Sequence, residues 1–316
     1  RFRQNTSNTA GRLTMSQSTV TDLPGFANAL KLDCTTADTS IAATEVGILQ
    51  YRFEGQDIQQ IKKGTSSAEP VTVSFYVKGN ANATYTLEFE DSDNSYRANS
   101  QEFSVTSSWT RVIKTFVADT TGTLDNDANQ SMQLNIWFHA GSNFTSGTFA
   151  SNTWQTDQTK RVGDNQTSFF DSTNRTLEIT GLQMEVGSIA TDFEHRSFQE
   201  EMQRCKRYYQ HIGYQYGDSI GATNTFNGAI PGFKMGGTST YYGGEMFPVE
   251  MRAVPTLTIY AVVSGTETAG KLIDFNSGAD LGSASVARLR ANGYNYLSSG
   301  SNSAGAVYRS VLDAEL

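Results

Sequence analysis

At 316 residues, the chain exceeds the usual length of a single domain, so we expect two domains that each bury a core. Its 32 acidic residues outnumber its 24 basic ones, and the net charge of −8 argues against nucleic acid or an anionic membrane surface as a partner. No apolar run approaches the roughly 20 residues that cross a bilayer, so we expect no membrane insertion.

The two cysteines, Cys34 and Cys205, are far apart in the sequence and lack the spacing of metal ligands. We interpret both as free thiols in a reducing cytosol, and a pairing between them stays open. The chain begins at Arg1 with the polar run RFRQN, without a Met or an apolar leader. We therefore expect it to be the ordered or processed part of a longer protein.

Short runs that alternate apolar and polar residues fill the first half of the chain, separated by Gly, Ser, Thr and Asn. Residues 71–78, 84–90 and 132–139 follow the two-residue period of a strand with one buried face. This pattern is typical of an all-β sandwich. The run 109–117 is apolar on both phases, so we predict a central strand covered on both sides for part of its length, with Trp109 in the core.

The end of the sandwich is predicted where the apolar phase changes. Apolar residues fall on odd positions at Leu177 and Ile179 but on even positions after Gly181, which indicates a β-bulge at that glycine. Farther on, Ser197 is followed three residues later by Glu200, the pattern of a capping box. We predict that a short helix begins there.

The last third of the chain is rich in Gly, Tyr and Ser and contains candidate strands at 257–263 and 306–312. We therefore predict an all-β protein in three parts. These are a sandwich over residues 1–196, a connecting helix over 197–211 and a smaller β-domain over 212–316.

Several phrases of the sequence resemble those of bacteriophage tail-fibre and other virion structural proteins. ITGLQMEVGSIATDFEHR at 179–196 is similar to the strand that closes a jelly-roll domain in those proteins, and RCKRYY at 204–209 is similar to the segment that follows it. FPVEMRAVPTLTIY at 247–260 resembles a second motif that comes later in many phage fibre proteins. The resemblance covers nearly the whole chain, because it includes the phrases at 30–43, 54–78 and 115–127.

The resemblance implies a jelly-roll form of the sandwich and a location on the virion, in a tail fibre or another surface appendage assembled in the host cytoplasm. It also implies a homotrimer that is attached to other virion proteins through an upstream anchor. The favoured function is that of a receptor-binding subunit that adheres to a host surface glycan without catalysis. The alternatives are a purely architectural head or tail decoration protein and a glycan depolymerase tailspike.

The candidate ligand-binding row is on the outward phase of the predicted strand 132–139. Asn135, Trp137 and His139 alternate there, and an exposed indole flanked by polar groups is suited to stacking on a sugar ring. Tyr76 would join this row if its strand lies in the same sheet. The alternative is that a loop or a neighbouring subunit covers Trp137, as is usual for large aromatic side chains on a surface.

Other aromatic residues are placed on predicted loops or in the last domain. Trp154 lies in a long polar segment and Tyr96 in the phrase DSDNSYRAN, so both are candidate contacts at loop tips. Tyr241 and Tyr242 belong to a Tyr-rich, Gly-rich region that resembles an adaptable recognition surface. The alternative is that these side chains pack within their own domains or in an oligomer.

A structural calcium ion is the one cofactor that the sequence suggests. Asp125, Asp127 and Asn129 alternate like the oxygen ligands of a calcium loop, but the glycine and glutamate of an EF-hand are missing from the required positions. Since jelly-roll binding modules often hold calcium, Glu185 and Asp192 are further candidate ligands.

Little in the sequence indicates an enzyme. The three histidines, His139, His195 and His211, have no evident nucleophile partner, and no hydrolase, nucleotide-binding or metalloprotease fingerprint is present. A pair of carboxylates suited to glycoside hydrolysis stays open among so many acidic residues. We interpret His195, which lies in the phrase DFEHR, as part of a structural corner.

Overall fold

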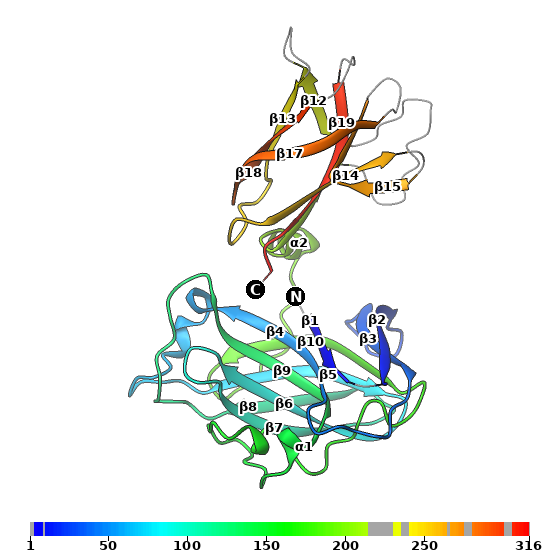
Figure 1. Ribbon diagram of the computed structural model, residues 1–316. Helices are drawn as coiled ribbons and strands as arrows, with labels where there is room; N and C mark the ends of the chain where they lie inside the picture. Colours follow the sequence, from blue (N-terminus) through cyan, green and yellow to red (C-terminus); the bar gives the residue numbers. More distant parts are fainter. Residues whose placement is uncertain are drawn as a thin grey trace. The chain divides into compact units, whose positions relative to one another are not determined.

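The computed structural model describes residues 3–8, 10–213, 230–234, 240–263, 266–274, 280–299 and 305–315. Strands dominate these residues, which confirms the all-β class (Figure 1). The chain divides into two compact units, Arg1–His195 and Arg196–Leu316. No helix in the described part of the chain combines the length and the hydrophobicity needed to span a bilayer.

The first unit is a jelly-roll β-sandwich of two antiparallel five-stranded sheets. Sheet A has the order β1 (Arg3–Ser7), β4 (Val46–Glu54), β9 (Gln130–Ala140), β6 (Ala83–Asp91) and β7 (Arg97–Val105). Sheet B has the order β2 (Arg12–Thr19), β3 (Asn28–Thr36), β10 (Thr176–Val186), β5 (Val71–Gly79) and β8 (Thr110–Phe116). The connections contain α1 (Ser142–Thr145), η1 (Gly55–Asp57), η2 (Gln59–Ile61) and η3 (Gln158–Lys160).

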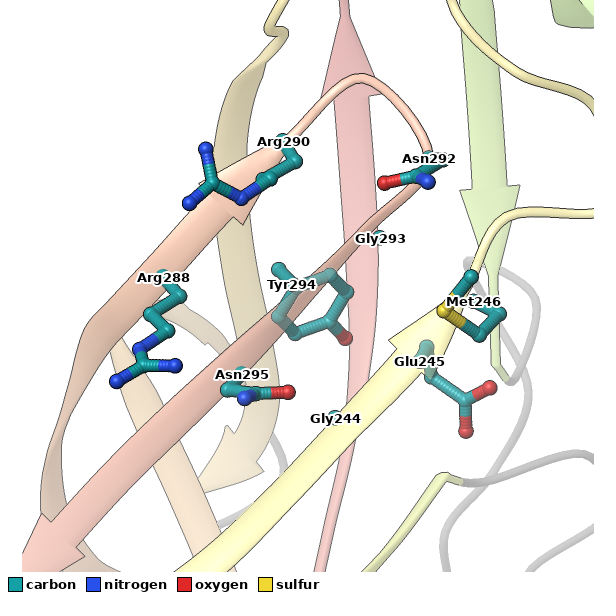
Figure 2. A pocket seen from close by; sticks show the side chains of 9 residues that line it. All are labelled: Gly244, Glu245, Met246, Arg288, Arg290, Asn292, Gly293, Tyr294 and Asn295. Carbon is teal, nitrogen blue, oxygen red and sulfur yellow. The ribbon is translucent and has the colours of Figure 1, made fainter.

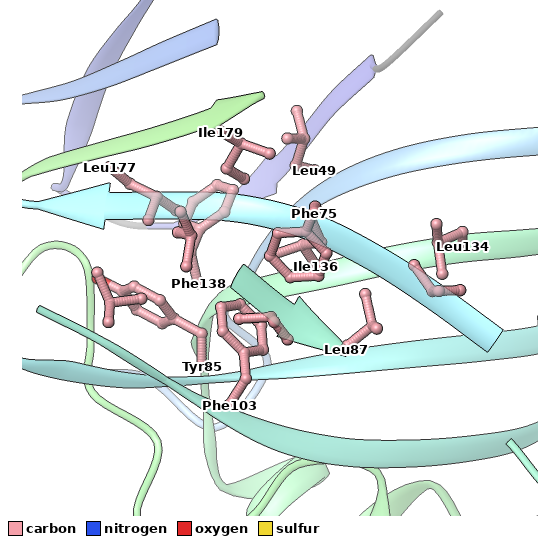
Figure 3. Close-up of a cluster of buried hydrophobic side chains, with 14 of the residues drawn as sticks. Leu49, Phe75, Tyr85, Leu87, Phe103, Leu134, Ile136, Phe138, Leu177 and Ile179 are labelled. Atoms are coloured by element: carbon pink, nitrogen blue, oxygen red, sulfur yellow. The ribbon is translucent and has the colours of Figure 1, made fainter. Parts of the chain in front are cut away.

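The core of the first unit lies between the two sheets, where the inward phases of their strands meet (Figure 3). Phe75 of sheet B and Phe103 of sheet A pack edge to face, with ring centroids 5.2 Å apart. The predicted alternation is confirmed, because every second residue of β5, β6 and β9 is buried in this cluster. Burying one such large side chain contributes about 1.5–3 kcal/mol, so the alternation selects which face of each strand turns inward.

Strand β8 does not have the predicted central position. It pairs only with β5, at the edge of sheet B, and Ile113 on its outer side is 48% exposed. Trp109 precedes the strand and is not in the core; its indole Nε1 donates a hydrogen bond of 2.8 Å to Asp22. The ammonium group of Lys78 lies 5.0 Å from the centre of the Trp109 ring. The apolar residues on both phases reflect an edge strand with partly exposed side chains.

The phase change at Gly181 is confirmed as a β-bulge. The register of β10 against β5 shifts between Thr180 and Gln183, and Gly181 has a φ of +61°. A β-carbon at this position would lie 2.8 Å from the ring of Phe26 and 3.1 Å from that of Tyr76. Glycine is therefore required here for both its backbone conformation and the close approach of two rings.

Replacing Gly181 by Ala is expected to lower the free energy of unfolding of the first unit by roughly 2–4 kcal/mol, because it adds left-handed backbone strain and overpacking. Gly270→Ala is the matched control, since Gly270 has a φ of +72° but no atom within 4 Å of the added carbon. It should cost its own unit only the backbone part, about 1–2 kcal/mol. Chemical denaturation of both variants measures the difference, and equal losses would contradict a role for the Phe26 contact.

The helix α2 (Phe198–Lys206) starts as predicted, but it ends before residue 211, because β11 (Tyr209–Ile212) forms in the last part of the range predicted as helix. The hydroxyl of Ser197 accepts a hydrogen bond from the backbone N–H of Glu200 at 3.2 Å, which caps the helix. Cys205 of this helix is an exposed free thiol, and Cys34 in the first unit is a buried one.

Six strands of the second unit form a closed antiparallel sheet. The order runs β12, β13, β18, β17, β16 and β19, and β19 pairs again with β12. Strands β14 and β11 pair with the C-terminal part of β19, and β15 pairs with β14. The strands predicted at 257–263 and 306–312 are confirmed as β14 and β19. The bounds are β11 (Tyr209–Ile212), β12 (Ile230–Lys234), β13 (Thr240–Met246), β14 (Thr256–Val263), β15 (Thr266–Ala269), β16 (Lys271–Asp274), β17 (Asp280–Arg290), β18 (Gly293–Ser299) and β19 (Gly305–Asp313).

Candidate functional site

The predicted row Asn135, Trp137 and His139 lies on the outer face of sheet A, but it is covered. Trp137 is 1% exposed, and the other two side chains are fully buried. The cover is formed by residues 141–171, here named the cover segment. Phe144 of this segment packs on the Trp137 ring at 5.1 Å between centroids. The indole is therefore not available for stacking on a sugar, and the alternative of a covering loop describes this face.

The cover segment is fastened to sheet A by a buried polar network around Glu88. The Glu88 carboxylate is fully buried and accepts hydrogen bonds from Trp137 Nε1 at 3.0 Å and Asn135 Nδ2 at 2.9 Å. Arg161 of the cover segment donates its Nε to the same carboxylate at 2.7 Å and also binds Glu90. Because hydrogen bonds between charged groups are strong, the Arg161 guanidinium group anchors the cover segment to the outer face of sheet A.

Glu90 lies at the margin of this network. Burial raises the pKa of its carboxyl group, while the positive charge of Arg161 opposes that shift. Gln133 and Asn135 donate hydrogen bonds to the two Glu90 oxygens at 3.2 and 3.3 Å. Glu88 and Glu90 are thus two carboxylates joined by one cation, and they are enclosed beneath the cover segment.

His139 has a partner that the sequence did not reveal. Its Nδ1 lies 2.8 Å from the hydroxyl of Ser168 in the cover segment, and its Nε2 lies 2.9 Å from Glu45. This contact corrects the expectation that no nucleophile adjoins a histidine, but Nδ1 faces the serine and Nε2 the carboxylate, the reverse of their use in a hydrolase triad. The imidazole is fully buried and Glu45 is 2% exposed. We interpret the His139–Ser168 hydrogen bond as a second contact that holds the cover segment on sheet A.

Tyr76 lies on the other sheet and does not join the Trp137 row. Strand β5 belongs to sheet B, where the Tyr76 ring packs against Phe26 with centroids 5.2 Å apart. Phe193 and His195 lie against the same Phe26 ring, each at 5.3 Å. The phrase DFEHR therefore folds back over the outer face of sheet B, in agreement with the structural role expected for His195.

The two candidate loop aromatics lie in different surroundings. Trp154 packs against the main core, and its indole Nε1 donates a hydrogen bond of 2.8 Å to the carbonyl of Val117. Tyr96 is 63% exposed, with a φ of +53°, in the turn between β6 and β7. Only Tyr96 therefore retains the exposed aromatic surface that a ligand contact needs.

The candidate calcium ligands are not brought together into one cluster. Asp127 accepts a hydrogen bond of 2.8 Å from the backbone N–H of Asn129, while the backbone N–H of Asp125 donates one of 3.0 Å to Asp93. Glu185 accepts from the hydroxyl of Thr191 at 2.6 Å, and the adjacent Asp192 points to solvent. Burial works against ionisation of Glu185, but the hydrogen bonds from Thr191 and Gln183 lower its pKa. Within the described ranges, no group of three or more acidic, His or Cys side chains is arranged for a metal.

The tyrosines of the second unit have mixed positions. Tyr241 and Tyr242 lie on β13, but their side chains fall outside the described part of the structure. Tyr294 is 3% exposed, and its hydroxyl lies 2.6 Å from that of Ser310 in the core. For Tyr294, packing within the domain is therefore the correct interpretation.

A shallow pocket of about 380 Å³ lies on one face of β13, β18 and β17, close to buried Tyr294 (Figure 2). We name it the trough. The register places Gly244 beside Asn295 and Asn295 beside Arg288, and the next row on the same face is Met246, Gly293 and Arg290. The trough is also lined by Glu245 and Asn292.

Glycine and strand spacing explain the shape of the trough. Gly293 and Gly244 carry no side chain, so the floor is low between Arg288 and Arg290 on one rim and Met246 on the other. A β-carbon on Gly244 would lie 2.5 Å from the Tyr294 carbonyl oxygen, and one on Gly293 would lie 2.7 Å from the Glu245 carbonyl oxygen. No local sequence pattern indicates this site, because its two rims belong to β13 and β17, which are far apart along the chain.

The comparisons with known proteins give structural similarities only. No family model and no curated protein matches the sequence. Among solved structures, the chain is similar to the CBM22-1 xylan-binding domain of Paenibacillus barcinonensis Xyn10C, with 13% identity, 58% of this chain and 87% of that chain covered, and a TM-score of 0.30. The tandem CBM22-1–CBM22-2 domain of the same protein has 10% identity, coverages of 97% and 85%, and a TM-score of 0.31.

A further similarity is to the enzymatically active domain of tailspike protein 4 from bacteriophage CBA120. The identity is 8%, 58% of this chain and 19% of that chain are covered, and the TM-score is 0.32. Because these TM-scores are low, no inference about ligand or activity rests on the similarities.

Proposed function

We propose that this chain is a subunit of a bacteriophage virion that binds a glycan on the host surface without catalysis. The observation that carries the binding role is the trough, in which Arg288, Asn292 and Asn295 are exposed beside a low glycine floor. Amide and guanidinium groups donate several hydrogen bonds in fixed directions, as the hydroxyl-rich surface of a glycan requires. The virion context is supported by the sequence phrases described above.

The proposal assigns different roles to the two units. The first unit is a scaffold, because its Trp137 face is closed by Arg161 and Ser168 from the cover segment. The second unit presents the binding surface. The remaining elements are those implied by the sequence resemblance: a homotrimer, assembly in the host cytoplasm and attachment to other virion proteins through an upstream anchor. Solution mass and imaging of the intact particle test these elements.

The architectural alternative is favoured by the same closed face, since a sandwich without an open binding surface suits a decoration protein. The depolymerase alternative has less support. Glu88 and Glu90 lie on the same face of β6, but both bind Arg161 beneath the cover segment and cannot reach a glycosidic bond in the folded state.

The test of the binding role is a panel of host-surface polysaccharides and inhibition of virion adsorption by the purified chain. Asn295→Ala is expected to weaken binding by about 5-fold, because one or two hydrogen bonds are lost. Asn165→Ala, at an exposed position of the first unit, is the matched control and should bind like the unaltered protein. Binding that is indifferent to both changes excludes the trough, and release of reducing ends would establish hydrolysis instead.

A further inference from the structure

Arg288 and Arg290 concentrate positive charge on one rim of the trough. They are separated by one residue on β17, so both side chains lie on the same face of the strand, and both are exposed. Figure 2 shows them side by side along this rim. Their strand neighbours on this face are Asn295, which adds an amide group, and Gly293, which carries no side chain.

The charge of this rim is not balanced by any acidic residue that the structure describes. Elsewhere, exposed or half-buried arginines form ion pairs, as Arg204 does with Glu200 and Arg175 with Asp171. Neither Arg288 nor Arg290 forms such a pair with a described residue. The acidic side chain of the trough, Glu245, points away from them in Figure 2, and burial raises its pKa.

The chemistry of the trough suits an acid group better than a neutral sugar ring. Tyr294 is the one aromatic residue among those that line the trough, but its side chain is only 3% exposed, so it does not present a ring face on which a sugar could stack. Guanidinium groups match carboxylate, sulfate and phosphate oxygens with paired hydrogen bonds. In a chain of net charge −8, two guanidinium groups that form no ion pair with a described residue provide a local attraction for anions that the rest of the surface opposes.

We propose that Arg288 and Arg290 bind the acid groups of an anionic glycan, with Asn292 and Asn295 contacting its hydroxyl groups. This inference rests on the proposed function and adds the class of ligand. It assigns specificity to charge, so an uncharged glycan with the same backbone should bind weakly.

The experiment uses the full chain and two matched polymer pairs: polygalacturonate with its carboxyl-reduced form, and dextran sulfate with dextran. Binding to at least one anionic polymer is expected, at least about 10-fold tighter than to its neutral partner, and weaker with added salt. The double variant Arg288→Gln/Arg290→Gln should lose this preference. The double variant Arg196→Gln/Arg204→Gln removes the same charge from exposed ion pairs of the same unit and should retain it.

The outcomes separate this inference from the proposed function. Equal binding of neutral and anionic polymers, or an unchanged preference in the Arg288/Arg290 double variant, overturns the inference but leaves glycan binding intact. Failure to bind either anionic polymer also overturns it, while the Asn295→Ala comparison on host polysaccharides still decides the function. Circular dichroism of each variant checks that the second unit remains folded.

Discussion

Arg161→Met is expected to lower the free energy of unfolding of the first unit by roughly 3–5 kcal/mol at neutral pH, the typical cost of leaving buried charges without their partner. Arg161 is the cation that holds the carboxylates of Glu88 and Glu90 beneath the cover segment, and its side chain is only 12% exposed. Methionine keeps the unbranched apolar stem of the side chain but none of its five donors. The loss should therefore come from charge and hydrogen bonding, with little contribution from packing.

The Arg161→Met defect should shrink as the pH falls. Burial already raises the pKa of Glu90, and removing Arg161 takes away the attraction that opposes this shift. A carboxyl group whose folded pKa is raised costs stability fully above that pKa, and the cost disappears below its unfolded pKa of about 4.3. The difference between the variant and the unaltered protein should thus widen from pH 4 to pH 7.

Urea unfolding across this pH range measures the Arg161 effect. Lys160→Met is the control, because Lys160 is the adjacent residue and its ion pair with Asp157 is 41% and 45% exposed. That change should cost less than about 1 kcal/mol at any pH. A pH-independent loss in Arg161→Met would show that lost packing, and not the carboxylates, is responsible. Faster proteolysis within residues 141–171 would show that the cover segment has been released.

Lys63→Met is expected to have a similar effect, roughly 3–5 kcal/mol, at a second buried ionic network. The ammonium group of Lys63 binds the carboxylate of Asp91 and lies 3.2 Å from that of Asp119. It also donates hydrogen bonds to the carbonyl oxygens of Thr121 at 2.7 Å and Gly122 at 3.0 Å. Its side chain is 2% exposed, so its removal leaves two acidic residues without this partner in the interior.

The neighbouring lysine provides the control. Lys62 pairs with Glu69 at 3.0 Å, but both side chains are largely exposed, at 51% and 41%. Lys62→Met should therefore change the free energy of unfolding by less than about 1 kcal/mol. If both lysine variants unfold at the same denaturant concentration, the Lys63 network does not stabilise the fold.

The oxygen atoms around Lys63 also predict a chemical rescue. Two carboxylates and two carbonyl oxygens surround the ammonium group, and hard cations such as Ca²⁺ bind that kind of oxygen set. Although burial opposes the ionisation of Asp119, the hydrogen bonds from Arg97 and from the backbone N–H of Thr121 lower its pKa, and both of these donors remain in Lys63→Ala. Calcium should raise the melting temperature of Lys63→Ala and leave that of Lys62→Ala unchanged. If calcium leaves the melting temperature of Lys63→Ala unchanged, the oxygen atoms around the missing ammonium group do not form a cation site.

Local sequence patterns predicted much of the secondary structure of the sandwich and the start of the helix that follows it. The alternation in β5, β6 and β9 identified which side chains enter the core, since a strand presents successive residues to opposite faces. The change of phase identified the bulge at Gly181, and Ser197 identified the first turn of α2. Each of these features depends on residues within a few positions of one another.

Tertiary structure decided what lies on the outer faces. Periodicity correctly placed Trp137 on the outward phase of its strand, but it contains no information about the segment that covers this face. The same limit applies to β8, whose apolar residues indicated a central strand although its place in the sheet is at the edge. Sheet order and register result from long-range packing, and local spacing does not encode them. They decide that Arg161 contacts Glu88, that Lys63 lies between two aspartates and that Arg288 lies beside Asn295.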